Sequence, residues 1–287
     1  MHHRKRRAHL LAALSLIAVL VLSGPAAAKN ANPGVSPPHA KAFGKSYEAW
    51  SVQWWQWVLG QKAPKPDGHP HPLFDTTGED CDVGQQGKVW FLGGIFGLVG
   101  TPTDPAAVTR DCAVPTGKAL FFPILNIAAD NVGVPPDQQQ SDLQGLVDTY
   151  CTPFLHSDVD LAVELDGRPL KHLESYEIEP TLFSYDLPEE DNLYQFFGVD
   201  WTGPPPEPPV PGAASCGYYL MLTPLSKGQH ELHIVASTEG LGGFGLDVTY
   251  NLDIGKGTSA ESGGGKHDNG HKRKNKDGVH HQGRHRR

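Results

Sequence analysis

The sequence lacks the short motifs that mark most nucleophilic, metal-dependent and nucleotide-binding enzymes. It has no G-x-S-x-G turn, no H-E-x-x-H helix and no phosphate-binding loop. A C-x-x-C pair, the usual spacing of cysteine ligands at a structural zinc site, is also missing. These absences favour a non-catalytic protein, although lyases and hydrolases built on β-sandwiches often need no short motif.

Long apolar runs are scarce as well. The run at residues 10–22 is shorter than the ~20 residues that a membrane-spanning helix needs. Basic residues precede it, and Gly24-Pro25 and the alanines at 26–28 follow it. This order is typical of a cleavable signal peptide at residues 1–28. We therefore predict cleavage after Ala28, a secreted or periplasmic protein, and no transmembrane segment in the mature chain.

Negative charge is concentrated in the middle of the chain. The whole sequence carries −8, the predicted signal peptide +4 and the segment from Lys256 onward +6, which leaves −18 on residues 29–255. A body this acidic repels phosphate groups, so we expect no nucleic-acid partner. Such a surface suits cations, neutral sugars or no particular partner.

Apolar residues are almost absent from residues 255–287, which are rich in Gly, Lys, Arg and His. Such a segment cannot bury enough surface to fold, so we predict a disordered basic tail. It is either a solvated terminus, a segment that attracts a polyanion or the acidic body itself, or a loose metal-binding segment. The histidines available for a metal are His267, His271, His280, His281 and His285.

Cysteine is limited to four positions: Cys81, Cys112, Cys151 and Cys216. In an exported chain, disulfides are the default use of cysteine. Four cysteines allow three pairings. We favour Cys81–Cys112, which flanks one hairpin-like unit, and Cys151–Cys216, which joins a helix end to a late strand.

The apolar pattern of the body predicts mainly β structure. Every second residue of 244–254 is apolar, and 159–165 alternates in the same way before a hairpin turn at Asp166-Gly167. Two further strands, 217–223 and 230–236, are separated by a turn.

Short strands of this kind, with 33 glycines and 25 prolines in the chain, predict an antiparallel β-sandwich of jelly-roll or immunoglobulin-like type, stabilised by disulfides. We expect it to form a single domain over residues 43–254, after a Pro-rich leader at 29–42.

Two amphipathic helices interrupt the strands. Ser46 is a suitable N-cap for a helix over 47–59. A second helix is expected after Pro135-Pro136, with its apolar stripe at Leu143, Leu146, Val147 and Tyr150.

Five aromatic residues lie on the first of these helices. Four of them share one face at helical spacing and are expected to be buried: Tyr47, Trp50, Trp54 and Trp57. Trp55 falls off that face, so we expect it at the surface. With Gln56 beside it, Trp55 is a candidate platform for a neutral glycan.

A polar loop from His69 to Asp82 carries the candidate catalytic groups. His71, Asp75 and Asp80 supply imidazole and carboxylate for acid–base chemistry. The alternative is an ordinary polar loop held by Cys81. Its spacing matches no metal motif, including the calcium loop, so we predict neither a metal nor a cofactor in the body.

A third candidate lies where the apolar segment 120–125 ends in Asn126, with Asp130 and Asn131 close behind. Polar groups at the end of a buried strand often line a pocket. They equally often cap the turn that follows. The sequence leaves both open.

Several longer strings resemble an uncharacterised family of secreted bacterial proteins. They are GKSY at 44–47 with WWQW at 54–57, HPLFDTTGEDC at 71–81, GKVWFL at 87–92, GKALFFPILN at 117–126, PLSKGQH at 224–230 and LDVTY at 246–250. The resemblance spans about 43–254 and implies export but no activity. The last strands are also similar to bacterial immunoglobulin-like modules, a likeness of fold alone.

Two functional hypotheses follow from these observations. The favoured one is a secreted binding or envelope protein for a glycan or other surface component. The alternative is a secreted polysaccharide-active enzyme, a lyase or hydrolase, that uses the loop from His69 to Asp82.

Overall fold

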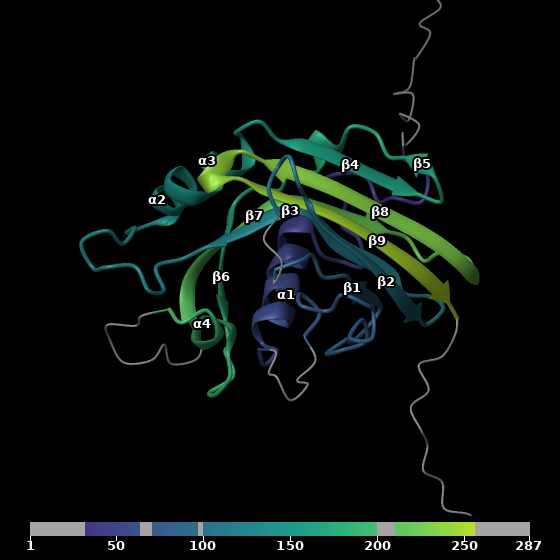
Figure 1. The fold of residues 1–287 in the computed structure, drawn as a ribbon, viewed down its shortest axis with the longest axis horizontal. Helices are drawn as coiled ribbons and strands as arrows, with labels where there is room; N and C mark the ends of the chain where they lie inside the picture. The colour runs from purple at the N-terminus through teal and green to yellow at the C-terminus, as the bar shows by residue number, and fades with distance from the viewer. Residues whose placement is uncertain (1–31, 64–70, 97–99, 200–209, 256–287) are drawn as a thin grey trace, which may run out of the picture.

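The fold is described from a computed structural model, which covers residues 32–63, 71–96, 100–199 and 210–255 (Figure 1). The predicted signal peptide, His69 and the tail beyond Gly255 lie outside these ranges, so the predictions made for them are unchanged. Within these ranges, no helix is both long and apolar enough to cross a membrane.

The protein is mainly β, and its strands form two sheets. The four-stranded sheet has the order β1 (Val89–Phe91), β3 (Ala119–Ala129), β7 (Val210–Leu222), β6 (Thr181–Tyr185). The five-stranded sheet has the order β2 (Ala106–Val114), β9 (Phe244–Ile254), β8 (Gly228–Thr238), β4 (Asp160–Leu165), β5 (Arg168–Pro169). Figure 1 shows β8 and β9 as long neighbouring bands that run across the molecule.

The predicted antiparallel pairing holds for five of the seven described strand pairs, and the other two pairs are parallel. β1 runs parallel to β3, and β2 runs parallel to β9, with Ala106 opposite Leu246. The two strands expected at 217–223 and 230–236 are found within β7 and β8, and they belong to different sheets. Parallel neighbours need a long crossover rather than a local turn. No local turn signal in the sequence therefore identifies such partners.

The hairpin between β4 and β5 is confirmed. Both turn residues have positive φ, 52° at Asp166 and 68° at Gly167, as a tight two-residue turn requires. The strand predicted at 244–254 is also found with those bounds, as β9.

The first predicted helix is α1 (Tyr47–Leu59), and the Ser46 side chain caps it by accepting from the backbone N–H of Ala49. It packs against β3, β6 and β7 of the four-stranded sheet. α1 is more deeply buried than an amphipathic surface helix, because Gln56 is its only exposed residue.

The second predicted helix is found as three consecutive pieces. These are α2 (Leu143–Leu146), a π-helical turn (Val147–Cys151) and α3 (Thr152–Leu155). Of the predicted stripe, Leu146 is buried, whereas Leu143, Val147 and Tyr150 are partly buried against the core. A further short helix, α4 (Leu193–Phe196), has an Asn192 capping box.

The Pro-rich leader contacts the body of the protein from residue 32 onward. Val35 is buried and bridges to Leu222 of β7. The Asn32 side chain exchanges two hydrogen bonds with the backbone of Lys171. Prolines discourage regular structure, but they do not prevent an extended segment from pairing at a sheet edge.

Both predicted disulfides are present, and no described cysteine is free. Cys81–Cys112 attaches the segment 71–96 to β2, and Cys151–Cys216 attaches the π-helical turn to β7. These links hold irregular segments against the two sheets.

Candidate functional site

Trp55 does not form an exposed platform. Only 8% of it is exposed, and its ring makes an edge-to-face contact with Trp54 at a centroid distance of 4.9 Å. Gln56 is exposed, but its Nε2 donates to the carbonyl of Ser184 at 2.8 Å. The expectation fails because α1 is covered on a second side by segments that are distant in the sequence.

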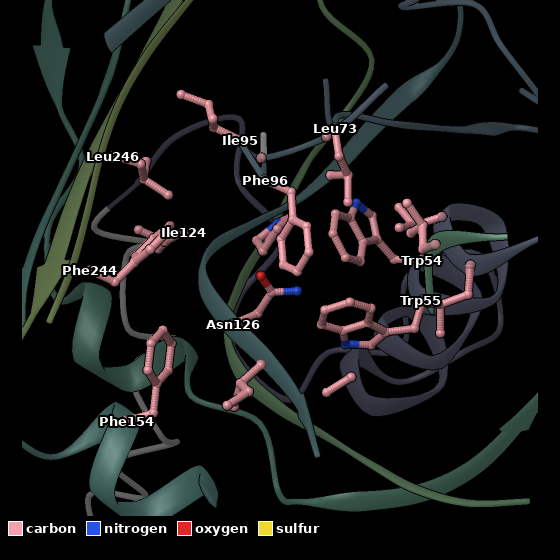
Figure 2. Close-up of a pocket in the computed structure, with 18 of the residues that line it drawn as sticks. Trp54, Trp55, Leu73, Ile95, Phe96, Ile124, Asn126, Phe154, Phe244 and Leu246 are labelled. Carbon is pink, nitrogen blue, oxygen red and sulfur yellow. The ribbon is translucent and has the colours of Figure 1, made fainter. Parts of the chain in front are cut away.

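Trp55 instead lines a cavity of about 410 Å³. The walls come from α1, from β3 of one sheet and from β8 and β9 of the other. Figure 2 shows the labelled Trp54 and Trp55 on one side of this space and Phe154, Phe244 and Leu246 on the other. Most of the lining is aliphatic or aromatic, so the cavity is an apolar space between secondary-structure layers.

Besides the indole rings of Trp54 and Trp55, three polar side chains line the cavity: Asn126, Asp130 and Tyr194. Figure 2 shows the carboxamide of Asn126 reaching into the space between Phe96 and Trp55. Its Nδ2 donates to the hydroxyl of Tyr219 at 3.0 Å. Among the residues that the structure describes, none donates a hydrogen bond to its Oδ1, which leaves an acceptor for a ligand.

Buried polar groups lie next to Asn126 in the apolar wall of the cavity. Tyr219 is fully buried, and this burial raises the pKa of its hydroxyl to about 12. The Nε1 of Trp55 is also buried; the Tyr219 hydroxyl is its nearby partner, although their geometry is not that of an ordinary hydrogen bond.

Asp130 follows the end of β3 and both caps a turn and lines the cavity, so both alternatives left open by the sequence are realised. Its Oδ1 accepts from the backbone N–H of Val132 at 2.9 Å. Its Oδ2 accepts from the hydroxyls of Tyr185 at 2.6 Å and Tyr194 at 2.5 Å. Burial, followed by the nearby Asp130 charge, raises the pKa of both phenols. They therefore remain protonated donors.

Exposed phenylalanines lie at the edge of the cavity. Phe96 and Phe197 both line it, are 48% and 47% exposed, and contact each other at a centroid distance of 5.0 Å. Phe74 stacks on Phe197, and Phe196 contacts both Phe74 and Phe197. The cavity thus continues into an aromatic cluster at the protein surface.

The candidate catalytic loop is a structural loop in its described part. The Asp75 carboxylate accepts from the backbone N–H groups of Thr77, Gly78 and Asp80. Asp80 in turn accepts from the backbone N–H of His71 at 3.0 Å. Burial raises the pKa of Asp80, and the charge of Asp75 adds to that effect while the His71 N–H opposes it.

His71 is 1% exposed, and burial lowers its pKa to about 4. Its Nδ1 accepts from the backbone N–H of Leu73 at 3.2 Å. Nε2 has no partner of ordinary geometry among the described residues, and the nearby carbonyl of Val58 offsets burial only in part. None of His71, Asp75 and Asp80 lines the large cavity.

Arg110, on β2, fixes one wall of the cavity, and sequence reasoning missed it. The side chain is 1% exposed. Its Nε donates to the carbonyl of Asp75, and its Nη atoms donate to Gly93, Gly94 and the hydroxyl of Tyr250, at 2.6–3.0 Å. Gly93 and Gly94 line the cavity, so this buried cation holds the segment before Phe96 in place.

A chain of Ser226, His230 and Asp166 has distances that resemble a nucleophilic triad. His230 Nδ1 lies 2.9 Å from Asp166 Oδ2, and its Nε2 lies 3.1 Å from Ser226 Oγ. However, Nε2 is 3.0 Å from the carbonyl oxygen of Ser226. This carbonyl competes with the Ser226 hydroxyl for the same ring nitrogen. The chain therefore joins two turns, and none of its members lines the cavity.

Metal binding receives no support from the described part of the chain, in which no group of three or more His, Cys, Asp or Glu residues could hold an ion.

Comparisons with known proteins do not identify the protein. No family model matches the chain, and no curated protein matches it. A solved structure titled "Solution Structure of Amebosin" aligns with 51% of this chain and 96% of its own, at 8% identity and a TM-score of 0.18. A likeness this weak carries no argument about fold or function, and the family resemblance seen in the sequence stays a prediction.

Proposed function

We propose that this protein is an exported, non-catalytic binding protein that holds one small apolar molecule in the cavity between its sheets. The observation that carries this proposal is the cavity itself, about 410 Å³ in volume and lined by aliphatic and aromatic side chains with few polar groups. Binding sites for small molecules are typically ~300–1,000 Å³ and have this composition.

An apolar ligand suits the cavity better than the glycan considered from the sequence. Each sugar hydroxyl that leaves water needs a new hydrogen-bond partner, or its burial costs free energy. Asn126, Asp130 and Tyr194 provide too few partners for a sugar ring. They suffice for the single polar end of a lipid-like or aromatic molecule, which is one form of the surface component first considered.

The polysaccharide-active alternative is less well supported. It needs carboxylate or imidazole groups that face a substrate. The Asp75 carboxylate is occupied by backbone N–H groups, and neither it nor His71 lines the cavity.

Export is part of the proposal. Two disulfides fit an oxidising compartment, and residues 1–28 have the order of a signal peptide. We also retain the sandwich arrangement of the two sheets as a proposal, whether of jelly-roll or immunoglobulin-like type. Capture of a polyanion or a metal by the basic tail remains a prediction as well.

Binding can be tested with N-phenyl-1-naphthylamine, a neutral apolar fluorophore that brightens when it leaves water. We expect saturable binding of about one fluorophore per protein. Ala128 shares the cavity-facing side of β3 with Asn126, because side chains two apart on a strand point the same way. Ala128→Phe should therefore fill part of the cavity and weaken binding at least tenfold.

The matched control is Ala162→Phe, which adds the same ring to an exposed position on β4. It should leave fluorophore binding unchanged. Equal binding by both variants and the original protein, with all three folded, would show that the fluorophore binds elsewhere and that the cavity is not the site.

A further inference from the structure

The charge inside the cavity indicates which apolar molecules it accepts, and this inference rests on the proposed function. Asp130 is the one charged residue in the described lining. It has no ion pair with Lys, Arg or His among the described residues. The cavity therefore presents one negative charge and no described positive charge to balance it.

The carboxylate is held in place by neutral donors. Tyr185, Tyr194 and the backbone N–H of Val132 orient its two oxygens. These donors make a half-buried carboxylate tolerable, but they cancel none of its net charge. Because the surrounding walls are apolar, that charge acts on a ligand more strongly than it would in water.

Aromatic rings line the same space. Trp55, Phe96 and Phe197 border the cavity, and ring faces attract cations through their quadrupole. A carboxylate among aromatic rings is an arrangement that favours an ammonium group. An anionic head group would instead face the Asp130 charge with no described cation beside it.

We propose that the cavity selects cationic amphiphiles, molecules with an apolar body and an amine or ammonium head that approaches Asp130. Asn126 supports the same choice, because its Oδ1 is an acceptor without a donor among the described residues. Fatty acids and other anionic amphiphiles are excluded by charge, although their chains would fit the apolar walls equally well.

The test uses three ten-carbon compounds that share one chain: decylamine, decanol and decanoate. At pH 7.5 they are cationic, neutral and anionic, respectively. Each is titrated against bound N-phenyl-1-naphthylamine in the full mature protein. We expect decylamine to displace the fluorophore at a concentration at least tenfold below decanol, and decanoate to be the weakest.

Asp130→Asn should reduce the preference for decylamine over decanoate at least tenfold. The control is Asp137→Asn, an exposed position that lowers the charge of the acidic body equally without lining the cavity. The Asp137→Asn variant should show the same preference as the original protein. This result would show that the preference comes from Asp130 in the cavity and not from the overall negative charge of the protein. If Asp130→Asn does not fold, Asn126→Asp should strengthen the preference, because it adds a second carboxylate to the same wall.

The inference is overturned if the original protein binds decanoate as tightly as it binds decylamine. It is overturned as well if folded Asp130→Asn keeps the original preference. It is also overturned if folded Asn126→Asp, used in its place, shows no stronger preference. Absence of fluorophore binding would be a failure of the proposed function instead, since selectivity is measured only on a cavity that binds.

Discussion

Replacing Arg110 by methionine should lower the free energy of unfolding by about 3–5 kcal/mol. The guanidinium donates to three backbone carbonyls and to the hydroxyl of Tyr250. Methionine fills much of the same volume but donates nothing. The carbonyl of Gly93 keeps a donor, because the Tyr250 hydroxyl also bonds to it.

The carbonyls of Asp75 and Gly94 would lose the donor that Arg110 provides. Each buried acceptor left without a partner costs about 1–3 kcal/mol. Two such carbonyls would cost about 2–6 kcal/mol, and removal of the buried charge offsets part of this, which is consistent with a total of about 3–5 kcal/mol. Arg110→Lys should lose nearly as much, since one ammonium cannot reach carbonyls that lie in different directions.

Urea unfolding monitored by tryptophan fluorescence measures this change, with exposed Arg168→Met as the matched control. The control should lie within ~0.5 kcal/mol of the original protein. Fluorophore binding should also weaken in Arg110→Met, because Gly93 and Gly94 line the cavity. A loss below about 1 kcal/mol in Arg110→Met would refute the assigned anchoring role.

Three further predictions concern stability. Because burial lowers the pKa of His71 from 6.5 to about 4, the unfolded chain binds a proton there before the folded one does. On acidification from pH 6.5 to 4, the original protein should therefore lose roughly 3 kcal/mol more stability than His71→Gln does. The same pH dependence of the urea midpoint in both proteins would contradict this. Replacing Cys151 and Cys216 by alanine opens a 65-residue loop and should cost ~4 kcal/mol in urea unfolding, and an unchanged midpoint would count against it. A chain ended after Gly255 should melt at the original temperature, whereas one ended after Gly243 loses β9 and should not fold, as circular dichroism will report.

The parts of the fold that the sequence predicts are those governed by local rules. Ser46 identifies the start of α1, and Asp166-Gly167 identifies a hairpin, because caps and tight turns depend on a few adjacent residues. The parallel pairing of β2 with β9 depends on strands at opposite ends of the body. Nothing in either strand specifies that partner.

In the candidate site too, local sequence rules predict some residues, whereas others depend on contacts between distant segments. Asn126 and Asp130 could be predicted as pocket residues, because they follow the buried part of a strand. Helical spacing placed Trp55 off the buried face, but it cannot show that a second layer covers the other face. Tyr194 and Arg110 reach the site from distant segments, and their roles depend on contacts made only in the folded chain.

The position of β9 sets the order in which the chain can fold. β2 is an edge strand whose one neighbour in the sheet is β9, and β9 is the last strand in the described chain. During synthesis, β2 stays unpaired until residues 244–254 have emerged. Contacts this distant in sequence make folding slow. The edge of the larger sheet formed by β2 is therefore completed only when the last described strand is in place.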